Sequence, residues 1–214
     1  MFSLTLPKHA DLQAASRLVA KRSLLPVMTR TEWAMLAGFG VVAAVMSTLL
    51  DFRLRLPGHA ILRAVFPMAA GLAAVPRRGG GTVMGLSAGL ASTLLQTSGL
   101  TGHGLGVGAF TSLLAIGPCL DVALWGARNG WQIWLSFTLS GVAANGLAFV
   151  TRGIAKKSAA MPLSFDDWLH RAPLSYLTCG LVAGLLSGMV WFAFGQPEHK
   201  GESPDALVPP RDLP

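Results

Sequence analysis

The chain has 214 residues, of which 52% are hydrophobic and only 13% are charged, and its formal net charge is +7. The mean hydropathy of +0.53 and the scarcity of charge argue against an ordinary water-soluble domain. An excess of Lys and Arg would suggest nucleic-acid binding in a soluble protein, but in a membrane protein these residues hold the cytoplasmic ends of helices. We therefore expect an integral membrane protein that binds no nucleic acid.

The first 32 residues form a polar, basic arm. Residues 10–25 have the pattern of a short amphipathic helix on the membrane surface, and a basic terminus without structure explains them equally well. No apolar core of a cleavable signal peptide precedes the first long hydrophobic stretch. We predict a cytoplasmic N-terminal arm over 1–32.

Six apolar stretches follow, and each is close to the about 20 residues that cross a bilayer as a helix. They cover residues 33–50, 59–75, 82–98, 105–125, 131–150 and 174–194. The predicted fold class is all-α: a polytopic membrane protein with six transmembrane helices in one bundle over residues 33–194. Residues 151–173 are the longest predicted connection, and residues 195–214 form a Pro-rich cytoplasmic tail.

The distribution of Lys and Arg predicts the orientation. With six spans, ten of these residues fall on the side of the two termini and six on the other side, while Arg63 lies inside the second span. Because positive charge accumulates on the cytoplasmic side, both termini are predicted to be cytoplasmic, in a bacterial inner membrane. The group Arg152, Lys156 and Lys157 runs against this bias.

Small residues repeat along three of the spans, as they do where membrane helices approach closely. The sixth span has Gly180, Gly184 and Gly188, and the third has Gly85 and Gly89. The first span has a face made of Ala37, Gly40, Ala44 and Ser47. We predict that this last face docks a partner subunit, and the alternative is ordinary packing inside the bundle.

Polar residues at membrane depth are candidates for function because each is costly there unless it is paired. Asp121 is expected to pair with Arg128 or Arg77 and so to fix a helix end. Asn145 and Gln96 are expected either to make interhelical hydrogen bonds or to contact a ligand. Arg63 could anchor its helix at the interface by extending its charge toward water.

Several polar side chains gather at the predicted outer surface, around or above Asn145. They are Arg53, Arg55, His59, Arg63, Gln96 and His103. A positive, histidine-containing mouth suits a small polar or anionic ligand, so these residues and Asn145 are the predicted binding site. Simple hydration of the surface is the alternative.

Signatures of catalysis and metal binding are absent from the sequence. None of the five His lies deep in a span, no H-x-x-x-H or H-E-x-x-H occurs, and the two cysteines, Cys119 and Cys179, form no C-x-x-C pair. A P-loop motif is also missing. We expect no enzyme, no metal site and no cofactor.

Two segments carry a family resemblance. LPGHAILRAVFPMAAGLAAVPRRGGGTVMGLSAG (56–89) resembles the region of the second and third spans in the substrate-binding (S) component of energy-coupling factor (ECF) transporters. AIGPCLDVAL (115–124) is similar to a Gly-Pro…Asp element of the fourth span in that family. The likeness in architecture covers roughly residues 33–194.

The resemblance implies a vitamin-like ligand bound from outside, and docking through the first span onto a transmembrane coupling protein served by two ATPases. The docking element typical of the family is Ala-x-x-x-Ala, which Gly40-x-x-x-Ala44 and Ala34-x-x-x-Gly38 replace here. The metal-specific branch has a histidine after the initiator Met, where this chain has Phe2, so cobalt or nickel uptake is not expected. The rival hypothesis is a non-catalytic accessory subunit of another membrane complex.

Overall fold

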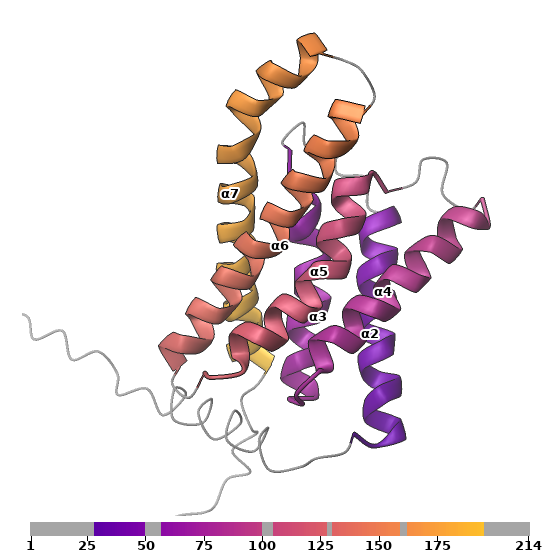
Figure 1. Cartoon of the computed structure of the whole chain (residues 1–214). Helices are drawn as coiled ribbons and strands as arrows, with labels where there is room; N and C mark the ends of the chain where they lie inside the picture. The colour runs from indigo at the N-terminus through magenta and orange to yellow at the C-terminus, as the bar shows by residue number, and fades with distance from the viewer. Residues whose placement is uncertain (1–27, 50–56, 100–104, 128–129, 159–161, 195–214) are drawn as a thin grey trace, which may run out of the picture.

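The computed structural model describes residues 28–49, 57–99, 105–127, 130–158 and 162–194, without the side chains of 162–168. These residues form six helices and no strand. The helices are α2 (Arg30–Leu49), α3 (Ala60–Ala74), α4 (Gly80–Thr97), α5 (Val107–Leu124), α6 (Gly130–Ser158) and α7 (Pro162–Phe194). They run up and down in one bundle, and the ends of α6 and α7 project beyond the others (Figure 1). The predicted all-α class is confirmed.

Local signals set the starts of two helices. Thr29 and Glu32 form a reciprocal capping box at the start of α2: the Thr29 amide donates to Glu32 Oε2 at 2.8 Å, and the Glu32 amide donates to Thr29 Oγ1 at 3.3 Å. α4 begins directly after Gly79, whose φ of 79° lies in the left-handed region that glycine adopts without strain. Residues 75–79 therefore turn the chain sharply between α3 and α4.

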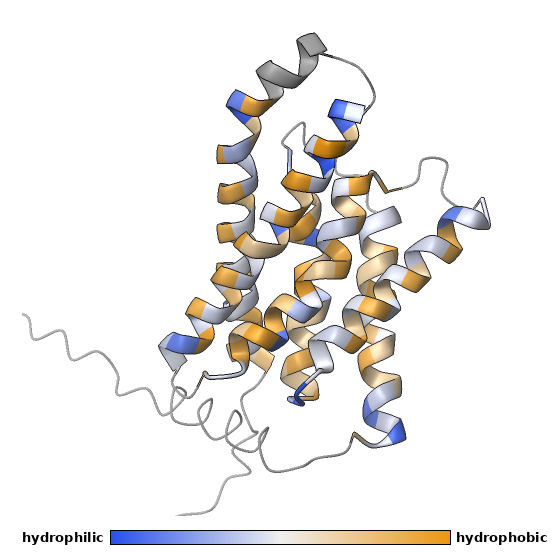
Figure 2. Ribbon diagram, viewed as in Figure 1, coloured by the Kyte–Doolittle hydropathy of each residue, from blue (hydrophilic) through white to orange (hydrophobic). Residues whose placement is uncertain are grey.

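The short helix α3 is the centre of the bundle. It contacts α2, α4, α5, α6 and α7, and nine of its 15 residues are buried. The large exposed apolar side chains lie instead on the other five helices, for example Leu86, Leu90 and Leu94 on α4. Figure 2 shows apolar residues distributed along the helices. An apolar exterior around an apolar core is the pattern of a protein that faces lipid.

Pairs of glycines bring neighbouring helices into backbone contact. A Cβ atom on Gly141 of α6 would lie 3.1 Å from the amide nitrogen of Gly184 on α7, and one on Gly180 would lie 2.7 Å from the Gly141 carbonyl oxygen. α4 and α5 meet in the same way at Gly81 and Gly117. The small-residue stripes of the third and sixth spans therefore pack inside the bundle, since only glycine allows this approach.

Four helices are long and apolar enough to cross a membrane: α2, α5, α6 and the Leu169–Phe194 part of α7. α3 is a shorter apolar helix, and α4 is not among the four. The composition of the helices thus indicates a membrane protein, while six crossings and the side of the termini remain predictions. The domain limits also remain predictions, because residues 1–27 and 195–214 lie outside the described residues.

The predicted long connection over 151–173 is wrong. α6 continues to Ser158 and α7 already begins at Pro162, so helix covers 151–158 and 162–173. The prediction ended both helices where charged residues begin. Charge marks the edge of the hydrocarbon region but does not break a helix, and Lys, Arg and Ala are good helix formers. Pro162 occupies the first helical position, where its missing amide hydrogen costs nothing.

Candidate functional site

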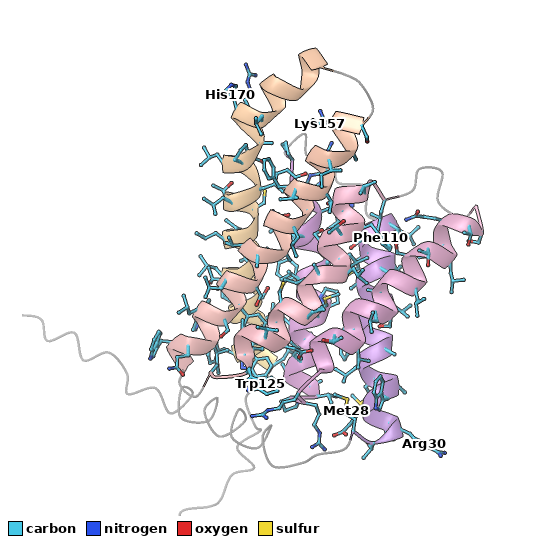
Figure 3. The ribbon with its side chains drawn as sticks, in the orientation of Figure 1. Met28, Arg30, Phe110, Trp125, Lys157 and His170 are labelled. Carbon is cyan, nitrogen blue, oxygen red and sulfur yellow. The ribbon has the colours of Figure 1, made fainter. Side chains whose placement is uncertain are left out.

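The predicted site residues divide between the two ends of the bundle. We define the His59 end by Ser47, His59, Arg63, Asn145 and Tyr176, and the Asp121 end by Glu32, Arg77, Thr82, Asp121 and Trp125. Figure 3 places Lys157 and His170 beyond the first end and Trp125, Met28 and Arg30 at the second. Four predicted residues lie outside the described residues: Arg53, Arg55, His103 and Arg128.

The turn before α3 is the meeting point at the His59 end. Ser175 Oγ donates to the Pro57 carbonyl oxygen at 2.6 Å, and Cys179 Sγ lies 3.8 Å from the same oxygen. Gly58 has a φ of 86°, and a Cβ atom there would lie 2.9 Å from Asn145 Nδ2. Only glycine fits this turn without strain, because the backbone is left-handed and the side chain of α6 is close.

Asn145 ties three parts of the chain together. It is 1% exposed, and its Nδ2 donates to the carbonyl oxygens of Tyr176 at 2.7 Å and Gly58 at 3.3 Å. Both hydrogens of the amide nitrogen are thereby used. Of the two roles predicted for Asn145, the interhelical hydrogen bond is the one that the structure contains.

Arg63 is half-buried on the first turns of α3 and bonds across to α2. Its Nη1 donates to the Ser47 carbonyl oxygen at 3.3 Å, and its Nη2 lies 2.9 Å from His59 Nε2. A guanidinium only donates, so His59 Nε2 must accept and the imidazole hydrogen belongs to Nδ1. The structure therefore brings together two predicted ligand residues, Arg63 and His59, beside the end of α2.

Gln96 does not make a direct contact with this pair through its amide nitrogen. That nitrogen lies 3.4 Å from Ser92 Oγ, one turn earlier on α4, and Ser92 is fully buried. The predicted set is therefore spread over separate hydrogen-bond groups: Arg63 with His59 and Ser47, Asn145 with Tyr176 and Gly58, and Gln96 with Ser92.

The predicted docking face of the first span points into the bundle. Gly40, Ala44 and Ser47 are buried, and Ala37 is half-buried. A Cβ atom on Gly40 would lie 3.1 Å from the carbonyl carbon of Met84 on α4. Packing inside the bundle, the alternative for this face, is what the structure contains, and a partner could reach it only if α4 moved aside.

Asp121 binds the start of α4. Its Oδ1 accepts from the Gly81 amide at 3.1 Å, and its Oδ2 accepts from the amide and hydroxyl of Thr82 at 2.6 and 2.7 Å. A helix N-terminus carries amide hydrogens without helical partners and a partial positive charge, so a carboxylate is stabilising there. The described partners of the Asp121 carboxylate are thus the backbone of Gly81 and Thr82 and the Thr82 hydroxyl, while Arg128, one of its two predicted partners, lies outside the described residues.

The arginines near Asp121 have other partners. Arg77 donates through Nε and Nη2 to Glu32 Oε1 at 2.9 and 2.8 Å, so the expected pairing of Arg77 with Asp121 is replaced by a bond to α2. Arg78 lies 4.8 Å from the centre of the Trp125 ring, within the range of a cation–π interaction. The turn between α3 and α4 is therefore bound to α2 on one side and to the end of α5 on the other.

Sequence reasoning missed several of these residues although local signals exist for two of them. Thr29-x-x-Glu32 is a capping-box sequence, and Pro57-Gly58 is a turn dipeptide. Thr82, Ser175 and Tyr176 gave no local signal, because their importance depends on which helix faces them. In the described part of the chain, no group of three or more His, Cys, Asp or Glu side chains is placed to hold a metal ion.

Comparison with known proteins adds no relative: no protein-family model, no curated protein and no solved structure matches this chain. The likeness to S components therefore depends on the two quoted segments and on architecture, and the function has to be argued from the residues at the two ends.

Proposed function

We propose that the chain is a six-span protein of a bacterial inner membrane with both termini in the cytoplasm. In that membrane it acts as the small-ligand-binding subunit of an uptake transporter, similar to an ECF S component. It has no catalytic activity and no cofactor of its own, and separate ATPase subunits, coupled through a transmembrane protein, supply the energy.

The observation that carries this proposal is the donor-rich group at the His59 end. Ser47 is 6% exposed, and its hydroxyl oxygen has no hydrogen-bond partner among the described residues. The backbone carbonyl of the same residue accepts from Arg63, which also contacts His59. A buried hydroxyl without a partner costs about 1–3 kcal/mol, and a bound molecule could offset that cost.

The chemistry of these groups selects the ligand class. Arg63 and the Nδ1 hydrogen of His59 are donors, and a guanidinium favours planar anions such as carboxylates. We therefore propose a small polar or anionic ligand that enters at the His59 end, with Arg53, Arg55 and His103 contributing from the neighbouring loops. Asn145 and Gln96 take a supporting part, since their amides are hydrogen-bonded to neighbouring groups.

A second candidate is supported by a different observation. Asp121 and Asn145, two of the polar residues at membrane depth, are used to join helices, and the glycine stripes pack helix against helix. A chain whose polar groups all serve its own packing would be an accessory subunit of another membrane complex. This candidate needs no ligand at the His59 end.

Pull-down of the full chain from gently solubilised membranes separates the two candidates. Recovery of a transmembrane coupling protein together with two ATPases would support the transporter. Recovery of a larger complex without ATPases would contradict it and support the accessory subunit.

A further inference from the structure

The paired ends of α6 and α7 carry a group of cations. α6 has 29 residues, so it is about 43 Å long, whereas the hydrocarbon layer is about 30 Å thick. Both helices therefore continue past the apolar layer at the His59 end, and Figure 1 shows them projecting there. Residues 151–173 contain four Lys or Arg and two Asp, a formal charge of +2.

The contacts between α6 and α7 fix which residues lie at the same height. Asn145 bonds to Tyr176, and Gly141 faces Gly180. Arg152 lies seven residues beyond Asn145, about 10 Å along the axis, and Arg171 lies five residues before Tyr176, about 8 Å along it. The two arginines are therefore at nearly one level on adjacent helices.

The apolar stretches of the two helices also end at this level. Val150 on α6 is 52% exposed and Leu174 on α7 is 69% exposed, and they are the last large apolar residues before Arg152 and Arg171 respectively. The apolar residues of α6 and of α7 thus mark the same boundary for the hydrocarbon layer. Arg152 and Arg171, both exposed, lie just beyond it.

Exposed apolar side chains continue beyond these cations. Ile154 is 65% exposed and Leu169 is 42% exposed, and exposed Lys157 and His170 lie beside them. Figure 3 shows Lys157 and His170 near the tips of the two helices. Alternation of cations with apolar side chains is typical of the membrane interface and not of a surface in bulk water. At the interface cations meet lipid phosphates and apolar side chains meet acyl chains.

We propose that the projecting pair, residues 150–158 of α6 and 169–174 of α7, binds the headgroups of anionic lipids such as phosphatidylglycerol. Arg152, Arg171 and Lys157 contact the headgroup phosphates, while Ile154 and Leu169 lie against the upper parts of the acyl chains. The stem of Arg152 lies beside Gly108 of α5. This site requires membrane insertion but not the transport function.

Lipid binding to purified full-length protein tests the proposal, measured by native mass spectrometry with phosphatidylglycerol and phosphatidylcholine. We expect wild type to prefer phosphatidylglycerol, and Arg152→Gln/Arg171→Gln to reduce that preference by about five-fold or more, because each cation near a membrane surface contributes substantially to anionic-lipid attraction. The control Arg30→Gln/Arg78→Gln removes the same charge at the Asp121 end and should keep most of the preference.

An equal loss in the control, or no loss in the double variant, would overturn the proposal. Arg152→Lys/Arg171→Lys should keep the preference. If the double variant does not fold, exposed Lys157→Gln decides, and an unchanged preference there would count against lipid binding. Failure of the membrane placement itself is distinguishable, because the wild-type protein would then be found in the soluble fraction of cells.

Discussion

The two ends of the bundle differ in the backbone groups that polar side chains bind there: amides at the Asp121 end and carbonyl oxygens at the His59 end. At the Asp121 end a carboxylate accepts from the amides of Gly81 and Thr82, where α4 begins. At the His59 end Arg63 and Asn145 donate to the carbonyl oxygens of Ser47, Gly58 and Tyr176. The side chain supplies an acceptor where backbone amides need one, at the Asp121 end. It supplies donors where backbone carbonyl oxygens need them, at the His59 end.

In both cases a polar side chain inside a helix completes the hydrogen bonds of backbone groups on another part of the chain. A membrane interior offers no water to backbone groups left open by a turn or a helix end, so a side chain must complete them. Asp121 and Asn145 do this fully through their own hydrogen bonds. The His59 end has in addition a buried hydroxyl, that of Ser47, without a partner among the described residues. Function is therefore expected at the His59 end and stability at both.

The largest effect is expected at Asn145, when its donor group is exchanged for an acceptor. Asn145→Asp would place a carboxylate against two carbonyl oxygens in a site that is 1% exposed. We expect a loss of about 3 kcal/mol in the free energy of unfolding, because a carboxylate cannot donate and is costly to bury. Unfolding in mixed detergent and SDS measures it. Asn145→Ala should lose less, and equal stability of both variants would contradict the proposed role.

At the other end, Asp121→Ala removes all three hydrogen bonds to the start of α4. We expect a loss of about 2 kcal/mol in the same unfolding measurement, the cost of an unfilled helix N-terminus and a lost charged acceptor. Thr82→Val removes only the hydroxyl bond and should lose about half as much. A loss for Thr82→Val as large as that for Asp121→Ala would show that the backbone bonds contribute little.

Gly58 tests how tightly the turn at the His59 end is packed. Gly58→Ala adds a Cβ atom 2.9 Å from Asn145 Nδ2 at a φ of 86°. We expect a loss of about 2 kcal/mol, of which about 1 comes from the left-handed backbone alone. Gly99→Ala is the matched control, because its φ is 71° but no atom of the described residues lies within 4 Å of the added Cβ. If Gly58→Ala and Gly99→Ala lose the same free energy of unfolding, the contact with Asn145 contributes nothing measurable.

The smallest change is expected at Glu32. Glu32→Gln keeps an oxygen for the Thr29 amide and removes only the charge that faces Arg77. The two side chains are 14% and 23% exposed, and an ion pair that reaches water contributes little and is screened by salt. We expect unfolding close to wild type at physiological ionic strength and a resolvable difference only at low salt, measured by thermal unfolding in detergent. A large loss of stability at high salt would contradict this and indicate that the pair is essential for holding α2 to the turn before α4.

More of the fold than of the candidate site could be predicted from the sequence. Six helices follow from apolar runs separated by Pro- and Gly-containing turns, and the glycine stripes already suggested close helix packing. The continuation of α6 past Val150 does not follow from hydropathy, because charged residues end the apolar run without ending the helix. The direction of each stripe was not predictable, since Gly40 could face α4 or lipid with the same sequence.

The site illustrates the same limit more clearly. The sequence alone suggested that Asp121 and Asn145 need partners, because polar groups at membrane depth always do. It did not indicate that the partners would be backbone atoms of residues 58, 81, 82 and 176, because those contacts arise from helix pairing across the bundle. Arg63 and His59 could be paired in advance, since they are one helical turn apart.

Native mass spectrometry of protein released from gently solubilised membranes can detect a ligand bound at the His59 end. The Arg63→Gln variant is compared with wild type and with Arg30→Gln at the opposite end. We predict that wild type and Arg30→Gln carry a small polar or anionic molecule and that Arg63→Gln, folded to the same extent, has lost it. A wild-type protein without any bound small molecule, or an Arg63→Gln variant that retains the same one, would contradict a ligand site at the His59 end.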